Sequence, residues 1–141
     1  PCLRECLIRP MKIVLASNNR GKLAELQSMF APLGVELICQ GDLFEGEAPE
    51  PFGTFVENAL SKARFAAERT GLPAIADDAG LCVDAFDGQP GVDTAYYCTH
   101  YGYEKSDANN VTCLLENLAP HANRQAAMVS TLVGVRHPKD P

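Results

Sequence analysis

An apolar strand, a polar loop, an amphipathic helix and a second strand follow one another near the start of this chain, and this pattern constrains its fold most. Residues 12–16 form a short apolar run typical of a buried strand, and residues 22–33 place large apolar side chains on one helical stripe. Gly34 is suited to end that helix, and residues 35–39 form the second strand. This order predicts a βαβ-like start and a domain of the α/β class. The stripe consists of Leu23, Leu26, Phe30 and Leu33.

The loop between the first strand and the helix, residues 17–22, reads Ser-Asn-Asn-Arg-Gly-Lys. A polar loop that opens into a helix places free backbone N–H groups and the positive end of the helix dipole at one point, which favours phosphate. Gly21 lets the backbone approach a ligand closely, and Lys22 adds a mobile positive charge. The loop is not a Walker A motif, because Ala16 and Leu23 stand where that motif has Gly and Ser or Thr. A polar capping loop without a ligand is the alternative reading of this loop alone.

A second helix is predicted after an acidic loop that covers residues 40–53. Thr54 and Glu57 have the spacing of a capping box, and Gly71 is suited to end the helix. The expected buried face of this helix consists of Val56, Ala59, Leu60, Ala63 and Ala67.

The rest of the chain alternates short strands with turns. Residues 73–76 are predicted as a strand, 81–86 as a candidate strand, 88–91 as a turn and 92–106 as a loop. Asp107 is expected to cap a helix that runs to about Leu118. Residues 125–136 alternate between apolar and polar side chains, which predicts a long half-buried strand.

Composition restricts the classes of function. With 141 residues and 46% apolar content, the chain can form one domain with a proper core. A net charge of −6 disfavours a sequence-independent nucleic-acid binder, which must neutralise phosphates, but it is compatible with a small anionic ligand. No apolar run approaches the roughly 20 residues that span a bilayer. We therefore expect neither a nucleic-acid partner nor a membrane.

Six cysteines are present, and none forms a Cys-x-x-Cys pair, so neither a zinc site nor a dense disulfide framework is predicted. Cys39, Cys82 and Cys113 fall in apolar segments and are expected to be buried thiols. The absence of a visible secretory signal favours the cytoplasm. The three histidines show no metal-ligand spacing.

The two ends of the sequence give further expectations. Residues 1–10 precede Met11, where the first strand begins, and are expected to be an upstream or cloning-derived leader. Residues 137–141 form a turn signal directly after a strand, which suggests that the natural chain continues. On this interpretation residues 11–141 are the N-terminal and central part of a domain, and its C-terminal part is absent.

Asp77 and Asp78 directly follow the strand predicted for residues 73–76. Adjacent strand residues point to opposite faces, so we expect only one of these carboxylates to enter a given site. Such a carboxylate is suited to hold Mg²⁺ and to take a proton from water. A structural role as a turn or cap residue is the alternative.

The acidic loop adds Glu45, Glu47 and Glu50, any of which could share a Mg²⁺ ion with a strand-end carboxylate and substrate phosphates. Asn58 and Lys62 lie one turn apart on the second helix, and Lys62 could reach a phosphate. The alternatives are a solvated acidic loop and a solubilising lysine.

Taken together, these motifs resemble the inosine/xanthosine triphosphate pyrophosphatases, also called Ham1-like proteins. The residues that carry the resemblance are 17–22, the Thr-Phe-Val-Glu-Asn-Ala of 54–59 with Lys62 and Ala63, the Pro-Ala-Ile-Ala-Asp-Asp of 73–78 with Gly80 and Leu81, and the Gly-Gln-Pro-Gly of 88–91. They stand in the family's order and spacing. The resemblance implies a single α/β domain with a long twisted mixed sheet flanked by helices, and a homodimer.

The resemblance also implies a reaction, the Mg²⁺-dependent hydrolysis of dITP, ITP or XTP to the nucleoside monophosphate and pyrophosphate. Glu50 and Asp78 correspond to metal ligands, and Asp78 also corresponds to the general base that activates water to attack the α-phosphorus. The implied substrate-binding residues are Ser17, Asn18, Asn19, Arg20, Gly21, Lys22, Lys62 and Ala79.

The chain departs from the family pattern at three places. Ala79 stands where family members usually have Ser, and Tyr96 stands where they commonly have an Arg that is suited to contact phosphate. The family's Phe-Gly-Tyr-Asp and Ser-His-Arg stretches, which recognise the base, do not occur in the chain.

Two other functions fit the same residues. One is a Maf-like pyrophosphohydrolase of pyrimidine or modified nucleotides, although that superfamily lacks the Glu-Asn-Ala and Ala-Asp-Asp-x-Gly-Leu signatures. The other is a nucleotide-binding domain without turnover.

Overall fold

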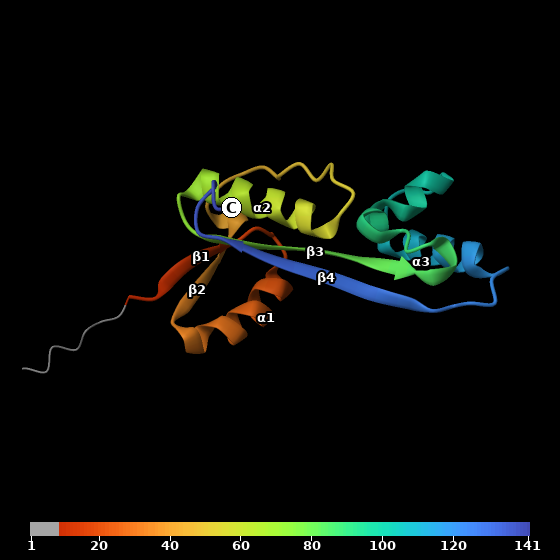
Figure 1. Ribbon diagram of the computed structural model, residues 1–141, viewed down its shortest axis with the longest axis horizontal. Coiled ribbons are helices and arrows are strands. Elements are labelled where there is room, and N and C mark those ends of the chain that lie inside the picture. The colour runs from red at the N-terminus through yellow and green to blue at the C-terminus, as the bar shows by residue number, and fades with distance from the viewer. Residues whose placement is uncertain (1–8) are drawn as a thin grey trace, which may run out of the picture. The chain divides into compact units, whose positions relative to one another are not determined.

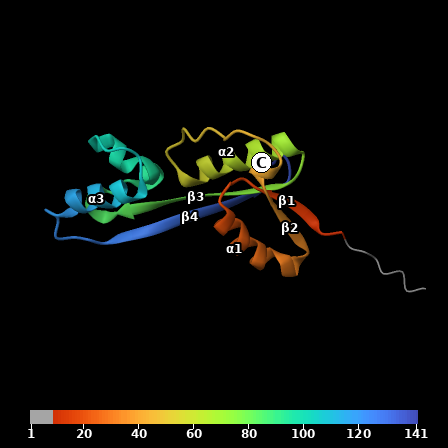
Figure 2. The ribbon, with the colours of Figure 1, turned by 180° about the vertical axis from the view of Figure 1, so that it is seen from behind.

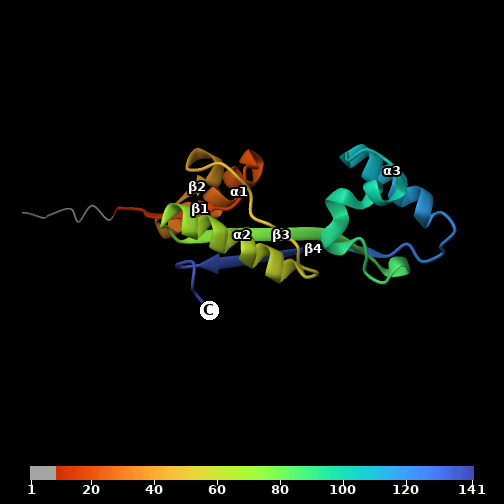
Figure 3. The same ribbon diagram turned by 90° about the horizontal axis from the view of Figure 1, so that it is seen from above.

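A four-stranded sheet with the strand order β2-β1-β3-β4 organises the chain. The computed structural model describes residues 9–141, so the leader predicted for residues 1–10 lies almost wholly outside the described residues. Strand β1 pairs in parallel with β2 and with β3, and the arrows of β3 and β4 point in opposite directions in Figure 3. The predicted α/β class, with a mixed sheet flanked by helices, is confirmed. The strands are β1 (Met11–Leu15), β2 (Val35–Cys39), β3 (Ala74–Val83) and β4 (Ala126–Val135).

Within residues 9–141, three α-helices and four 3₁₀ segments connect the strands. The α-helices are α1 (Arg20–Phe30), α2 (Phe55–Thr70) and α3 (Asp107–Leu118). The 3₁₀ segments are η1 (Ala31–Leu33), η2 (Gln40–Asp42), η3 (Asp84–Phe86) and η4 (Gly91–Tyr101). Over the part of the chain that the structure describes, no helix is long and apolar enough to cross a membrane.

The chain divides into two compact units, and β3 and β4 contribute residues to both. The first unit contains the described residues up to Pro51 together with Ala59–Ala76 and Leu132–Pro141. The second contains Phe52–Asn58 and Asp77–Thr131.

In the first unit, helices α1 and α2 lie on opposite faces of the sheet, as Figures 1 and 2 show from two sides. The alternation of side chains along β1 produces this arrangement. Leu15 packs with Ile75 and Leu37 against the apolar stripe of α1, whereas Val14 packs with Ala16 against α2. The residues of α2 in that second cluster are all alanines or a leucine, namely Leu60, Ala63, Ala66 and Ala67. Their small size lets the helix approach the sheet closely.

Both predicted helical stripes need one correction. Leu33 is 73% exposed, because α1 ends at Phe30 and Pro32 tightens the following turn into 3₁₀ geometry, which moves Leu33 off the stripe. Val56 is 50% exposed, because the residues of α2 that pack against the sheet come from its later turns. The first half of the capping box is confirmed, since the Thr54 hydroxyl accepts from the Glu57 N–H at 3.3 Å; the Glu57 carboxylate reaches back to the same hydroxyl, from which it accepts at 2.7 Å.

In the second unit, η4 packs against α3 through Tyr97, Cys98 and Cys113. The Asn110 carboxamide ties the two elements together, accepting from the Cys98 N–H at 2.9 Å and donating to the Ala95 carbonyl at 3.0 Å. Burial raises the pKa of the Cys113 thiol. Of the predicted buried thiols, Cys39 and Cys113 are buried, whereas Cys82 is only half-buried.

The structure also changes three boundaries in this region. Residues 73–76 and 81–86 are not separate strands, because β3 runs without interruption from Ala74 to Val83. The predicted loop 92–106 is largely the 3₁₀ segment η4. Ser106, rather than Asp107, caps α3, and its hydroxyl accepts from the Asn109 N–H at 3.0 Å.

Asp140 holds the last residues of the chain in place by hydrogen bonds to Arg136 and Arg64, and these bonds can be tested by mutation. Its carboxylate accepts from the Arg136 backbone N–H at 2.7 Å and from the Arg136 guanidinium at 2.6 and 2.9 Å. Its carbonyl accepts from the Arg64 guanidinium of α2 at 2.9 Å. These hydrogen bonds to Arg136 hold the pKa of Asp140 well below its ordinary value of 3.8.

We expect Asp140→Asn to lower the melting temperature at pH 7, because the asparagine keeps the shape but loses the charge-assisted bonds. A carboxyl group with a depressed pKa stabilises the fold above its unfolded pKa and loses that effect as the pH falls through the folded value. The difference between parent and variant should therefore stay constant down to about pH 4 and shrink at lower pH. Thermal unfolding followed by circular dichroism checks this, with Lys139→Gln as an exposed control. A difference that is already lost by pH 5 would contradict it.

Candidate functional site

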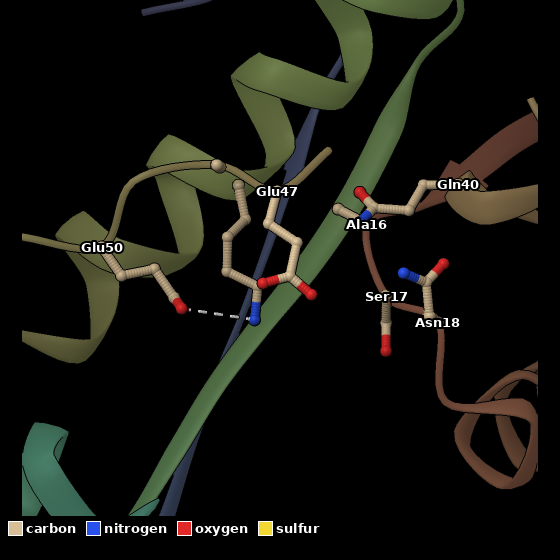
Figure 4. Close-up of a pocket in the computed structure, with 8 residues that line it drawn as sticks. Ala16, Ser17, Asn18, Gln40, Glu47 and Glu50 are labelled. Carbon is tan, nitrogen blue, oxygen red and sulfur yellow. Dashed lines mark ion pairs between the residues drawn. The ribbon is translucent and has the colours of Figure 1, made fainter. Parts of the chain in front are cut away.

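A pocket of about 150 Å³ lies in the first compact unit. Figure 4 shows how its side chains come from the loop after β1, the start of η2, the acidic loop and α2. The pocket is lined by Ala16, Ser17, Asn18, Gln40, Glu47, Ala48, Glu50 and Lys62.

Parallel pairing brings two of these segments together. Leu15 and Cys39 are partners at the ends of β1 and β2, so the residues that follow them leave the sheet at the same edge. The Ala16 N–H also donates to the Ile75 carbonyl at 2.9 Å, which holds the start of the loop against β3. The carboxyl edge of parallel strands is the usual place for a ligand in an α/β sheet.

The predicted phosphate loop is shorter than the sequence suggested, because α1 begins at Arg20 rather than at residue 22. Asn19 caps this helix, and its Oδ1 accepts from the Lys22 N–H at 3.0 Å. The N–H groups of Arg20 and Gly21 fall in the first turn, where no carbonyl of the helix stands one turn earlier. They mark the positive end of the helix dipole beside the pocket.

The guanidinium of Arg20 forms a bidentate ion pair with Asp42 of η2, with N···O distances of 3.0 and 2.5 Å. The pair lowers the pKa of the Asp42 carboxyl and raises the pKa of Arg20. Both side chains are largely exposed. Of the six predicted loop residues, Ser17 and Asn18 line the pocket, whereas Asn19 and Arg20 hold the helix start and η2 beside it.

Asn18 is packed against the backbone of Gly41. A Cβ atom at Gly41 would lie 2.3 Å from Asn18 Oδ1, so only glycine leaves room for the side chain in this position. The amide of Asn18 is thereby fixed at the edge of the pocket (Figure 4).

Glu50 and Lys62, two of the predicted site residues, meet in the pocket. Lys62 Nζ lies 3.5 Å from Glu50 Oε1, and Figure 4 marks this ion pair. Two contacts hold the acidic loop on α2 so that the pair can form. The Ser61 hydroxyl donates to the Pro49 carbonyl at 2.8 Å, and the Phe44 ring packs edge-on against Phe65. Glu47 adds a second carboxylate to the same pocket.

Asp77 and Asp78 belong to the second unit, and they lie inside β3 rather than after a strand as predicted. Asp78 Oδ2 is buried and has no hydrogen-bond partner. A buried carboxylate oxygen without a partner is costly and is usually kept for a ligand or for chemistry. Ala79 is exposed and also lies inside β3, next to Asp78.

Gly80, two residues after Asp78, lies where β3 comes close to the start of η4. A Cβ atom there would lie 2.1 Å from the Gly91 carbonyl oxygen, so glycine lets β3 approach the start of η4. Thr94 joins the two segments, since its hydroxyl accepts from the Leu81 N–H at 2.8 Å and donates to the Gly91 carbonyl at 2.6 Å.

The metal-binding capacity of these residues follows from their oxygen atoms. Among residues 9–141, His, Cys, Asp and Glu side chains form no group of three or more that could hold a metal ion by themselves. Mg²⁺, however, is usually bound by one or two carboxylates together with substrate phosphates and water. In the first unit the pocket carboxylates Glu47 and Glu50 are donors of this kind, and in the second unit the unpartnered oxygen of Asp78 is another.

Sequence reasoning did not identify Gln40, which the structure places in the pocket. It did single out Asn58, whose side chain is already hydrogen-bonded within the protein. The carboxamide of Asn58 is used on the backbone of Phe52, accepting from its N–H at 3.1 Å and donating to its carbonyl at 3.0 Å. Gln40 lines the pocket directly after β2. A polar residue that ends a buried strand was the signal for Ser17, and it would have found Gln40 as well.

Comparison with known proteins gives a consistent picture. Residues 13–141 match the model of the Ham1 family. The chain is 82% identical over 131 residues to the dITP/XTP pyrophosphatase of Delftia acidovorans and 77% identical to that of Paracidovorax citrulli. These matches cover 93% of the chain and 66% of each relative, so the chain spans just under two thirds of their length.

Solved structures agree. A HAM1 protein from Coxiella burnetii is 38% identical and superimposes with a TM-score of 0.84, over 93% of this chain and 66% of the other. A nucleoside-triphosphatase, or dITP/XTP pyrophosphatase, from Mycobacterium abscessus is 41% identical with a TM-score of 0.76, over 93% and 68% of the two chains.

We expect Gly41→Ala to weaken the binding of inorganic tripolyphosphate by about three- to tenfold, the effect of one lost hydrogen bond. The added methyl group displaces only the end of the Asn18 side chain, so the melting temperature should change little. Gly53→Ala is the matched control, because a Cβ atom there meets nothing within 4 Å. Titration calorimetry measures both variants. Equal affinities of the parent and both variants would show that the position of Asn18 is irrelevant to anion binding.

Proposed function

Because the chain belongs to the Ham1 family, we propose that the protein hydrolyses the deaminated purine nucleotides dITP, ITP and XTP to the nucleoside monophosphate and pyrophosphate. The observation that carries this proposal is the pocket in which Ser17, Asn18, Glu50 and Lys62 meet, because these residues match the family motifs and suit a polyphosphate chain. The family match also speaks against the Maf-like alternative. The preference for deaminated purines is supported by the relatives' names.

The residues at the start of α1 are proposed to bind the triphosphate. Ser17 and Asn18 offer a hydroxyl and a carboxamide from the pocket wall, and the first turn of α1 offers backbone N–H groups. Anions are favoured at such a helix start. Lys22 and Lys62 add positive charge to neutralise phosphate oxygens.

Glu50 and Asp78 are proposed to hold Mg²⁺, with Glu47 as a further carboxylate in the same pocket. When bound, Mg²⁺ polarises phosphate oxygens and neutralises the charge that develops on them. Support for this pairing comes from the family resemblance and from the unpartnered oxygen of Asp78.

Asp78 is also proposed to act as the general base. Its carboxylate accepts a proton from the water that attacks the α-phosphorus, and the bond to the pyrophosphate leaving group then breaks. Ala79 offers no hydroxyl, so any substrate contact at that position runs through its backbone N–H.

Lys105 is proposed to compensate for the loss of a cation at Tyr96. Its Nζ lies 4.0 Å from the centre of the Tyr96 ring, which is the geometry of a cation–π contact. The Lys105 ammonium group therefore places a positive charge over the Tyr96 ring, at the position where the family commonly has Arg.

The cellular location and the oligomeric state are proposed from the same family resemblance. We propose a cytoplasmic homodimer that removes deaminated nucleotides from the nucleotide pool. No nucleic acid takes part, in keeping with the net charge of −6.

Product analysis tests the proposed reaction. The chain, and a form extended over the remaining length of its relatives, are incubated with Mg²⁺ and dITP, XTP, dGTP or TTP. We expect pyrophosphate and monophosphate from dITP and XTP. Diphosphate and phosphate as products, or turnover of TTP instead, would contradict the proposal. Nucleotide binding without any product would assign a binding function.

We expect Asp78→Asn to lower kcat by at least about 100-fold, the usual contribution of a general base. The variant should melt at the same or a higher temperature, because a buried carboxylate oxygen without a partner is replaced by a neutral group. Asp84→Asn, an exposed change six residues later, is the control and should keep the parent's rate. Turnover by Asp78→Asn close to that of the parent would refute the assignment of the base.

A further inference from the structure

Gln40 is a buried polar side chain that the fold itself does not use. The residue is 7% exposed, and the little surface it keeps opens into the pocket. Its backbone carbonyl accepts from the Leu43 and Phe44 N–H groups at 2.9 and 3.0 Å, which builds η2. Within residues 9–141 its carboxamide forms no hydrogen bond with the protein. Its amide atoms are not among the fully enclosed polar atoms without a partner, so they remain open to the pocket, where a ligand can bind them.

Gln27 shows what a structural glutamine looks like in the same unit. Its Nε2 donates to the Val35 carbonyl at 3.0 Å, and its Oε1 accepts from the Leu37 N–H at 2.8 Å. Both ends of that carboxamide are occupied, and they join α1 to β2. The two residues therefore have the same side chain, but only the carboxamide of Gln27 forms hydrogen bonds with the protein.

The place of Gln40 in the pocket suggests its partner. Asn18 packs on the Gly41 backbone, so the Asn18 side chain lies beside Gln40 at the ends of two parallel strands. Figure 4 shows these two carboxamides on one side of the pocket, with Glu47 and Glu50 on the other. The pocket thus has a neutral amide wall facing a charged wall.

A carboxamide is suited to bind a phosphate oxygen beside such a charged wall. Its NH₂ group supplies two donors without a charge, so the carboxylates opposite do not draw it into an ion pair. Lys62, by contrast, already lies 3.5 Å from Glu50. We propose that Gln40 is a substrate-binding residue whose Nε2 donates to an oxygen of the substrate's phosphate chain. This inference rests on the proposed function and assigns that site one more ligand-binding group.

The proposal predicts opposite effects on stability and on binding. Without a ligand, the Gln40 amide adds no hydrogen bond to the fold, so replacement by an apolar side chain of similar size should leave the melting temperature unchanged or raise it. The same replacement removes a donor to a charged oxygen. A glutamine kept for packing would give the reverse result.

The experiment compares Gln40→Met with Gln27→Met in the full chain. Titration calorimetry with inorganic tripolyphosphate gives the affinity, and thermal unfolding without a ligand gives the stability. For Gln40→Met we expect affinity to fall by about 10- to 100-fold, as for a hydrogen bond to a charged group, with no loss of melting temperature. For Gln27→Met we expect a lower melting temperature and an unchanged affinity.

Gln40→Glu is the second variant, because it keeps the shape but replaces the donor by an anionic oxygen. It should bind tripolyphosphate still more weakly than Gln40→Met. Unchanged affinity in both Gln40 variants would overturn the proposal, and if the parent still released pyrophosphate from dITP, the proposed function would stand. A parent chain that neither binds tripolyphosphate nor releases pyrophosphate, in its extended form as well, would overturn both.

Discussion

The parallel pairing of β1 with both β2 and β3 is the interaction on which the rest of the first unit depends. It sends the loops after β1 and β2 out at one edge of the sheet, where Ser17 and Gln40 then stand close together. It also divides the apolar side chains of β1 between two faces, so that α1 and α2 each find a surface to cover. The pocket and the core therefore arise from the same hydrogen-bond ladder.

Helix α2 has a double role that its sequence reflects. Its inner face is built from alanines, which bring the helix axis close to the sheet. Lys62 and Ser61 on neighbouring positions reach the acidic loop instead, one through an ion pair and one through a hydrogen bond to the backbone. The alanines fix how close α2 lies to the sheet. They therefore also determine where Lys62 and Ser61 meet the acidic loop.

Much of this arrangement could be predicted from local patterns, and the failures have physical causes. The strand at residues 35–39, the capping box at Thr54 and the long alternating strand near the end are set by neighbouring residues, and each was found. The continuity of β3 was missed because two aspartates inside a strand look like a strand end. The ion pair of Arg20 with Asp42 depends on how distant segments meet, which no local pattern reveals.

The ion pair between Lys62 and Glu50 has a consequence for selectivity. A lysine whose charge is balanced by a glutamate attracts a lone anion only weakly, so chloride, sulfate or free phosphate gains little by entering the pocket. A chain of several phosphates is different, because Ser17, Asn18 and the first turn of α1 offer it further hydrogen-bond donors beside the ion pair. The resting ion pair thus favours a chain of linked phosphates over a single small anion.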